Sequence, residues 1–415
     1  GGIFLIIYIV LALTFGYTMI VAETAIGRMT RKSPVGAFKS FGKKKWLSFG
    51  GWINAVIPVL IVPYYSVIGG WVIKYLVEYF RGNAKQLAED GYFTDFISNG
   101  VSTELCFMAF CAFTLIIIFA GVQNGIERVS KIMMPILIVL SVIIAVYSVT
   151  RPGALAGVKY FLVPNVKNFS WMTVVSAMGQ MFYSLSIAMG ILITFGSYMK
   201  KDTAIEDSTR NVEVFDTGIA IMAGLMIIPA VFAFSGGDPN TLQAGPSLMF
   251  ITIPKVFQNM GFGTVIGIVF FLLVLFAAVT SSIALTESAV STFEDELGWG
   301  RKKATVLVGV IMLALGSLSS LGYGPLAGIK IIGMQFLDLF DFLTNSVMMP
   351  IAALLTSLFV SRVVGIDKIE AEIIHGESAF RRKKVFVVMI KYLCPVFAII
   401  ILLSSVANAL GWIKM

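Results

Sequence analysis

Three hydroxyl side chains stand together in the stretch AAVTSSIAL, residues 277–285, inside a long uncharged segment. Thr280, Ser281 and Ser282 span about 200° of a helix, so they cannot all face one neighbour. Ala277 precedes Thr280 by three residues and Ser281 by four, which places two hydroxyls and a carbonyl on one face. Oxygen donors without a carboxylate suit a weakly held monovalent cation such as Na⁺, whereas Mg²⁺ and Ca²⁺ favour carboxylates. Hydrogen bonding between packed helices is the alternative role for these hydroxyls.

A second hydroxyl-rich stretch is GQMFYSLSIAMG, residues 179–190, where Gly179 and Gly190 bracket Ser184 and Ser186. An interrupted helix here would free backbone groups, which membranes tolerate only where those groups line a cavity or bind something. Broken helices of this kind form the substrate and ion sites of many secondary transporters. From the residues alone the simpler interpretation is that each serine bonds to the carbonyl four residues earlier. Both interpretations stay open at this point.

Acidic side chains are scarce inside the apolar segments, and such residues are functional candidates by default. They are Glu23, Asp216, Glu287, Asp295, Asp338 and Asp341. Asp338 and Asp341 begin a helix, where interaction with the helix dipole is a sufficient explanation. No set of a nucleophile and a base stands out, and no phosphate-binding loop does, so we expect no enzyme activity.

The elements that must position these residues are membrane helices. Hydrophobic residues make up 58% of the 415 and charged residues 13%, against about 25% charged residues in soluble chains. A spanning helix needs about 20 predominantly apolar residues. Ten segments meet that condition: residues 3–27, 46–79, 103–121, 129–150, 171–199, 213–237, 261–293, 303–322, 337–362 and 384–413. We therefore expect an all-α integral membrane protein, with residues 1–415 forming one transmembrane domain in the lipid bilayer.

The basic residues predict which way the helices run. Alternate connections, starting with the one after the first helix, hold 21 of the 31 Lys and Arg residues, and the richer side is cytoplasmic by the positive-inside rule. The net charge of +8 then reflects topology and attraction to the membrane surface, so it does not indicate nucleic-acid binding. On the outer side, residues 236–260 are long and apolar for a simple loop. Two short amphipathic pieces near 242–250 and 253–260 are expected to cap the outer vestibule.

The stretches above, together with YYSVIGGW (64–71), NGIERVSKIMMP (124–135) and FEDELGWGRKKA (293–304), resemble the neurotransmitter:sodium symporter family, in particular its bacterial amino-acid transporters. The resemblance covers the whole chain. It implies the leucine-transporter-like fold of two inverted five-helix repeats, in which the first and sixth helices unwind around substrate and sodium. The opening GGIFLIIY matches the family's second helix. The ten helices are therefore expected to be family helices two to eleven, in a chain truncated before the second helix.

The resemblance also assigns sodium ligands. They are Ser184 and Asp216 in a first site, and the Ala277 carbonyl with the Thr280 and Ser281 hydroxyls in a second. Asp216 stands where the family usually has Asn, and Ala220 stands where chloride-dependent relatives have Ser. A carboxylate at Asp216 would supply the negative charge that chloride supplies elsewhere, which implies chloride independence.

The substrate pocket implied by the resemblance consists of Ile61, Tyr65, Tyr183, Ser184, Ser186, Met189, Ser281 and Leu285. Tyr65 would hydrogen-bond a substrate carboxylate, while Tyr64, on another helix face, is interpreted as packing. Tyr183 would be the aromatic lid. The walls are uncharged, and Met189 is flexible and polarizable, which favours a neutral substrate with a hydrophobic side chain.

Two further acids match gates of the family, Asp341 on the outer side and Asp295 on the inner side. The sequence thus predicts a sodium-coupled symporter for a neutral, hydrophobic amino acid, working by alternating access in the cell's inner (plasma) membrane. A proton-coupled amino-acid permease, with Glu23 or Glu287 as the proton carrier, is one alternative. A relative that binds its ligand without transporting it is the other.

Overall fold

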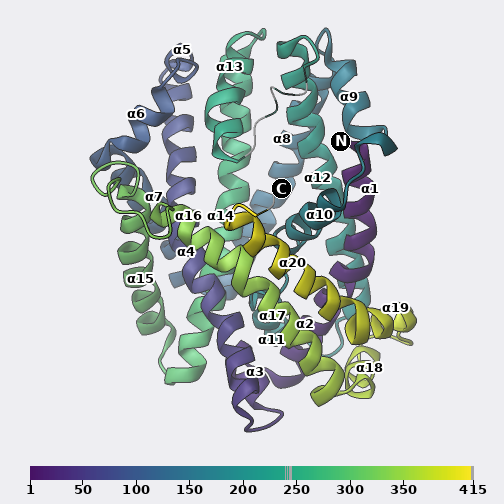
Figure 1. The fold of residues 1–415 in the computed structure, drawn as a ribbon. Helices are drawn as coiled ribbons and strands as arrows, with labels where there is room; N and C mark the ends of the chain where they lie inside the picture. Colours follow the sequence, from purple (N-terminus) through teal and green to yellow (C-terminus); the bar gives the residue numbers. More distant parts are fainter. Residues whose placement is uncertain (239, 241, 243–244, 413–415) are drawn as a thin grey trace.

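The computed structural model describes residues 1–238, 240, 242 and 245–412, and in this part of the chain the fold is a bundle of helices (Figure 1). Nine helical segments among these residues are long and apolar enough to cross a membrane. They are Gly2–Thr30 (α1, Gly2–Leu11, and α2, Tyr17–Thr30), Lys45–Phe80 (α4), Gly100–Phe119 (α7), Val122–Val149 (ending in α8, Arg128–Val149), Ile205–Ser235 (α12), Gly263–Leu297 (α14), Arg301–Leu321 (α15), Phe336–Val364 (α16, Phe336–Asp341, and α17, Met349–Phe359) and Lys383–Ala409 (α19, Lys383–Val388, and α20, Cys394–Ala409).

The one predicted segment not among these nine, residues 171–199, is two half-length helices instead of one. They are α10, Trp171–Ser184, and α11, Ile191–Tyr198, with residues 185–190 outside both helices. The helix that contains Asp216 also differs from its predicted bounds, because α12 begins at Ile205 and not at residue 213. Asp216 therefore lies about 16 Å along the helix axis, at 1.5 Å per residue, and well inside the helix.

Several spanning segments contain a π-helical turn, in which the backbone hydrogen bonds reach one residue further than in an α-helix. These turns are Ala12–Gly16, Val122–Glu127, Phe342–Met348, Val360–Val364 and Met389–Leu393. Such turns insert an extra residue into the helix and occur frequently near functional sites.

Short helices connect the spanning segments. They are α3 (Pro34–Lys39), α5 (Ala84–Leu87), α6 (Tyr92–Ser98), α9 (Ala154–Leu162), a 3₁₀ turn at Val166–Asn168, α13 (Ile253–Gln258) and α18 (Ile366–Ile374). Of the two pieces expected in 236–260, the first includes residues 243 and 244, which lie outside the described residues. The described part forms a single apolar helix, Leu248–Gln258.

This outer helix packs on the end of α4. The Tyr75 hydroxyl donates a hydrogen bond of 2.7 Å to the Phe250 carbonyl, and the Phe250 ring stacks on Phe93 with 5.2 Å between centroids. Trp71 contacts Phe250 edge-on at 5.8 Å. Aromatic pairs of this geometry stabilise a fold beyond their buried area, so this helix is held against the scaffold. Its capping role stays a prediction.

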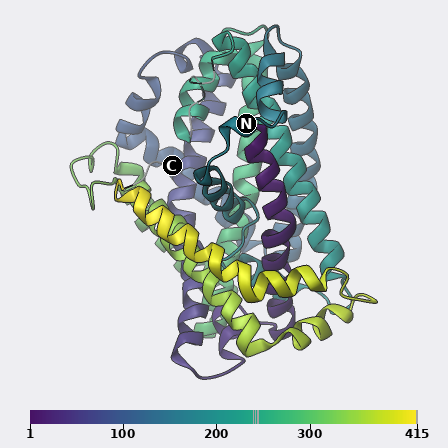
Figure 2. The ribbon, with the colours of Figure 1, turned by 45° about the vertical axis from the view of Figure 1, so that its right-hand side comes forward.

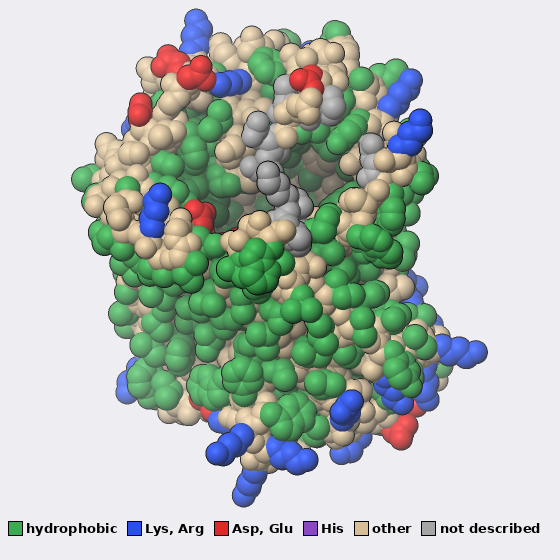
Figure 3. Space-filling model, in the orientation of Figure 1, with side chains coloured by type: hydrophobic (Ala, Val, Ile, Leu, Met, Phe, Trp, Pro, Cys, Tyr) green, Lys and Arg blue, Asp and Glu red, His purple; other side chains and the backbone are tan. Residues whose placement is uncertain are grey.

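The helices pack in an order that brings distant parts of the sequence together. The long helices α4 and α14 lie side by side, and α2 packs against α11, which places the helix break beside the first helix of the chain. Figure 2 shows α19 and α20, in yellow, crossing one face of the bundle obliquely. A broad band of apolar side chains covers the face shown in Figure 3, and Lys and Arg side chains gather along its lower edge. That edge is the end that the sequence predicts to be cytoplasmic.

Candidate functional site

The break between α10 and α11 has a left-handed backbone at three positions. Ser186 has φ 54°, Ala188 has φ 58° and Gly190 has φ 74°. Non-glycine residues with positive φ are uncommon and persist only where surrounding contacts hold them. One such contact comes from α2, where the fully buried Glu23 accepts a hydrogen bond of 2.8 Å from the Ala188 amide. A carboxylate of the first spanning segment therefore holds the unwound backbone.

Only one of the two bracketing glycines belongs to the break. A Cβ atom at Gly190 would lie 2.6 Å from the Asn54 carbonyl oxygen, and its φ is in the left-handed region, so this position needs glycine. A Cβ atom at Gly179 would meet no atom within 4 Å. We expected Gly179 and Gly190 to lie at the two ends of the break. Gly190 does, whereas Gly179 lies inside α10 with no atom close to its Cβ position.

The break borders a cavity of about 180 Å³. Its lining comes from α4, from the α10–α11 junction and from α14. The lining residues are Ile61, Tyr65, Tyr183, Ser184, Ser186, Met189, Ile191, Ser281, Ala284 and Leu285. All eight residues that the resemblance implied for a substrate pocket are brought together here. Their roles remain a prediction, but their common location is a finding.

Two further residues of the lining, Ile191 and Ala284, were not predicted from the sequence. Ala284 follows Ser281 by three residues, and residues three apart share a helix face, so that spacing would have identified it. Ile191 is the first residue of α11, and its position in the lining depends on where the helix resumes. The sequence does not specify that point.

The cavity is polar only through hydroxyl and backbone groups, since its described lining includes no charged residue. The aliphatic and thioether walls are supplied by Ile61, Met189 and Leu285. Such a lining suits an uncharged side chain, because an unpaired charge buried here would lose its hydration.

Asp216 lies next to the break, as part of the first predicted sodium site. Ser184 donates a hydrogen bond of 2.7 Å to one oxygen of the Asp216 carboxylate, and the Tyr8 hydroxyl donates one of 2.6 Å to the other. The structure thus brings both predicted ligands into contact and adds Tyr8, which the sequence analysis did not identify. The hydroxyl and carboxylate oxygens are of the hard type that Na⁺ binds.

The second predicted sodium site lies on α14, which is unbroken from Gly263 to Leu297. The Thr280 hydroxyl donates to the Ala277 carbonyl at 3.0 Å, so these two oxygens are close enough to share one cation. Ser281 is exposed and lines the cavity. Because α14 has no break at this point, the Ala277 carbonyl lies beside the Thr280 hydroxyl within a regular helix.

Ser282 has the other role that the sequence left open. Its buried hydroxyl lies 3.1 Å from the Thr114 hydroxyl on α7. This contact ties two packed helices together, as hydroxyl pairs commonly do in membranes. Neighbouring hydroxyls in AAVTSSIAL therefore have different partners because they project from different sides of α14.

The two predicted gate acids are held by neutral donors. Asp341 accepts hydrogen bonds from the Tyr64 hydroxyl at 3.2 Å and from the Asn345 amide at 2.5 Å. Tyr64 was interpreted as packing alone, and its contact with Asp341 corrects that interpretation. Asp295 accepts a hydrogen bond of 2.6 Å from the Ser33 amide, at the start of α3. Asp341 is the last residue of α16, and Asp295 lies near the C-terminal end of α14.

The two candidate proton carriers have different surroundings. Glu287 forms an ion pair with Arg301 at 2.6 Å and accepts a hydrogen bond of 2.7 Å from Tyr198, which marks it as a paired charge of the inner half. Glu23 has one oxygen bonded to the Ala188 amide, while the other finds no partner in the described part of the chain.

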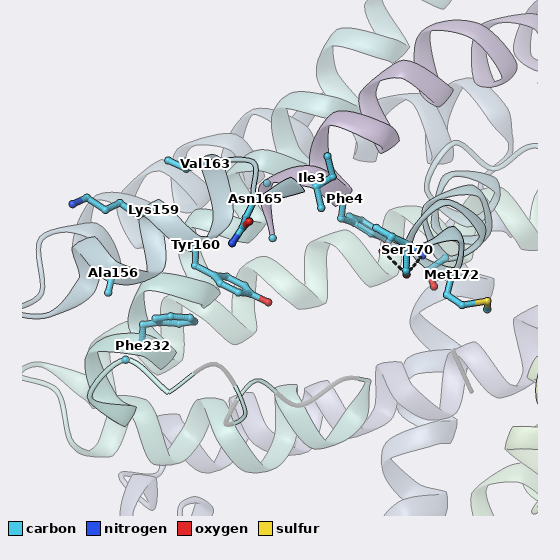
Figure 4. A pocket seen from close by; sticks show the side chains of 15 residues that line it. Ile3, Phe4, Ala156, Lys159, Tyr160, Val163, Asn165, Ser170, Met172 and Phe232 are labelled. Carbon is cyan, nitrogen blue, oxygen red and sulfur yellow. Dashed lines mark hydrogen bonds between the residues drawn. The ribbon is translucent and has the colours of Figure 1, made fainter. Parts of the chain in front are cut away.

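A larger cavity of about 860 Å³ lies at the outer end of the bundle, between α1, α9 and α10. Figure 4 shows Tyr160 and Asn165 on one side of this cavity, with Phe4 and the Ser170 hydrogen bonds near the start of α10. It contains none of the residues that the sequence assigned to substrate or sodium. Volume alone therefore does not select the functional site.

Comparison with known proteins decides the family. The sequence model of the Sodium:neurotransmitter symporter family matches residues 1–88 and 77–412. The chain belongs to this family. It is similar to the sodium-dependent transporter YhdH of Bacillus subtilis (strain 168), with 33% identity over 410 residues, covering 98% of this chain and 90% of that relative. The human sodium- and chloride-dependent GABA transporter 2 is 24% identical over 431 residues, covering 88% of this chain and 67% of that protein.

The fold agrees with that of a solved structure. The crystal structure of MhsT in complex with L-phenylalanine superposes with a TM-score of 0.87, at 33% sequence identity, covering 98% of this chain and 92% of that chain. The predicted leucine-transporter-like fold is therefore confirmed. The sodium:neurotransmitter symporter family is a family of transporters, so this chain is a multi-pass membrane transporter that uses sodium and is not an enzyme.

Proposed function

We propose that this symporter carries a neutral, hydrophobic amino acid together with Na⁺ across the cell's inner (plasma) membrane by alternating access. The observation that carries the proposal is the convergence of eight residues in one uncharged cavity at a helix break. Binding sites at interrupted helices near mid-membrane are typical of secondary transporters. A cavity of about 180 Å³ suits a molecule of the size of one amino acid.

The substrate class follows from the lining. The Tyr65 hydroxyl and the backbone of the break would bind the polar end of an amino acid, and Ile61, Met189 and Leu285 would face its side chain. Met189 can adapt its shape to side chains of different size. MhsT, which is 33% identical to this chain, was crystallised with L-phenylalanine, and this supports a large apolar or aromatic side chain for the substrate here as well.

Coupling would arise because substrate and sodium share residues. Ser184 belongs to both the cavity lining and the predicted first sodium site, and Ser281 belongs to the lining and the predicted second site. A group that contacts both ligands makes each one stabilise the binding of the other, and this coupling is reciprocal. Two Na⁺ sites are therefore proposed, with Asp216 as the charged ligand of the first.

The test is uptake into proteoliposomes that contain the full-length protein. Radiolabelled phenylalanine should accumulate when Na⁺ is outside, and neutral hydrophobic amino acids should compete while aspartate and lysine should not. Replacing Na⁺ by choline should abolish uptake. Uptake that is unaltered in choline would favour a proton-coupled permease, and sodium-dependent binding without uptake would identify a non-transporting relative.

A further inference from the structure

A separate pocket of about 200 Å³ lies where the end of α8, the end of α12 and the chain leading into α14 meet. Arg151, Ala233, Phe234, Asn259 and Gly261 are among the residues that line it. It shares no lining residue with the cavity at the helix break. The connections that meet here are on the side that the sequence predicts to be extracellular.

The Arg151 guanidinium is positioned by one residue, Tyr147. Its Nε donates to the Tyr147 carbonyl at 3.2 Å, and the group lies over the Tyr147 ring at 4.3 Å from the centroid. The ring is fixed in turn, because the Tyr147 hydroxyl donates to the Gly261 carbonyl. Stacking and one hydrogen bond thus orient the planar guanidinium and its N–H donors in the absence of a ligand.

Among the residues that the structure describes, the side-chain contacts of Arg151 are the Nε hydrogen bond and the stacking on Tyr147, so its two terminal nitrogens make no hydrogen bond or ion pair there. The described lining of the pocket includes no carboxylate. Asn259 donates one amide N–H to the Lys255 carbonyl at 2.8 Å, and an asparagine amide has a second N–H to offer. Ala233 and the partly exposed Phe234 form one wall of the pocket.

We propose that this Arg151 pocket binds a tetrahedral oxyanion, namely a phosphate group. Arginine recognises phosphate through two parallel N–H···O bonds, and the oriented fork with its unused nitrogens provides that geometry. The phosphate would come either from inorganic phosphate outside the cell or from the headgroup of an outer-leaflet phospholipid. Bound there, it would join the C-terminal end of α8 to Asn259, which directly follows the outer helix Leu248–Gln258.

The first arm of the test measures thermal unfolding of the full-length protein in detergent. Sodium phosphate is titrated against sodium chloride at constant ionic strength and constant Na⁺. Phosphate should raise the unfolding temperature of the parent and of the control Arg81→Gln, whose guanidinium is also on the outer side but pairs with Glu78. It should raise that of Arg151→Gln only at concentrations about tenfold higher or not at all, because the substitution removes the charge-assisted hydrogen bonds to phosphate.

The second arm distinguishes the source of the phosphate. Native mass spectrometry compares binding of phosphatidylglycerol with binding of a galactolipid that lacks phosphate, in the same three proteins. Retention of phosphatidylglycerol that Arg151→Gln loses and Arg81→Gln keeps would support a lipid headgroup. Protection by inorganic phosphate alone would support the free ion. Equal behaviour of all three proteins in both arms would overturn the proposal.

Discussion

At the residue scale, the hydrogen-bond partner of each hydroxyl in residues 280–282 depends on the side of α14 from which it projects. Ser282 bonds to Thr114 across two helices, whereas Thr280 bonds back to the Ala277 carbonyl and Ser281 faces the cavity. The sequence left sodium binding and helix packing open as alternatives for all three. The structure shows the helix-packing contact for Ser282, and sodium binding by Thr280 and Ser281 stays a prediction.

The double change Thr280→Ala with Ser281→Ala should therefore weaken sodium-stimulated substrate binding. Each donor removed from a buried cation costs about 1–3 kcal/mol, so sodium affinity should fall by at least tenfold. Ser282→Ala is the matched control, because it removes a neighbouring hydroxyl that contacts Thr114 instead of the cavity. Sodium titrations of binding in the full-length protein measure the effect. Curves for the double variant that overlay the parent would assign these hydroxyls to packing.

Asp216 yields a prediction about chloride. Its carboxyl group accepts hydrogen bonds from Ser184 and Tyr8, and we propose that a carboxylate here takes the place of a bound chloride ion. Asp216→Asn combined with Ala220→Ser should convert the protein to chloride-stimulated transport, since it removes the charge and adds a hydroxyl one turn along α12. Asp216→Asn alone is the control and should lose transport without gaining a chloride response. Chloride dependence in the unmodified protein would contradict the role assigned to Asp216.

At the element scale, the break in the helix 171–199 shows what the sequence could and could not predict. The motif GQMFYSLSIAMG marked the region, and the family resemblance implied the unwinding. The positions of the break were not predictable, because Ser186 and Ala188 are not residues that favour a left-handed backbone. Their conformation depends on Glu23, which is 165 residues away in the sequence. Contacts at that distance leave no local signal.

The short helix α18 is fixed to the inner end of the bundle by a buried ion pair. Arg28 on α2 contacts Glu372 at 2.7 Å, with side-chain exposures of 0% and 5%. Lys201, on the connection between α11 and α12, reaches the same carboxylate at 2.9 Å. Glu372 therefore connects α18 to α2 and to the α11–α12 connection, and hydropathy alone does not predict these contacts.

Glu372→Gln should destabilise the protein strongly, because it leaves the guanidinium of Arg28 buried without a counter-charge. Breaking one partner of a buried pair costs about 3–5 kcal/mol. Glu370→Gln is the control on the same helix. Its pair with Lys383 has side-chain exposures of 26% and 43%, and exposed pairs contribute about 0–1 kcal/mol. Thermal unfolding in detergent should show a large drop for the first variant only. Equal melting of the two variants would mean that the Arg28 pair contributes no more than a surface contact.

At the scale of the whole molecule, the apolar segments predicted the architecture well because membrane helices must satisfy their own backbone hydrogen bonds. Nine of the ten predicted segments are long helices in the described chain. What the segments could not predict is how the helices pack. The cavity is lined from α4, α14 and the α10–α11 junction. The packing of α4 against α14 depends on contacts between residues distant in the sequence. The family resemblance predicted which residues meet in the cavity, and hydropathy does not contain that information.

The orientation of the bundle follows from its charges and can be tested directly. The connections that hold Lys303 and Lys85 lie on opposite sides of the membrane by the positive-inside rule, and both side chains are exposed. In intact cells, a membrane-impermeant maleimide should label Lys85→Cys of the full-length protein, and should label Lys303→Cys only after permeabilisation. Of the three cysteines in residues 1–415, Cys111 and Cys394 are buried and Cys106 is partly so. Cys106→Ser is therefore the background for both variants, and the background protein should stay unlabelled. If Lys303→Cys were the variant labelled in intact cells, both the charge rule and the assignment of Asp341 to the outer gate would be wrong.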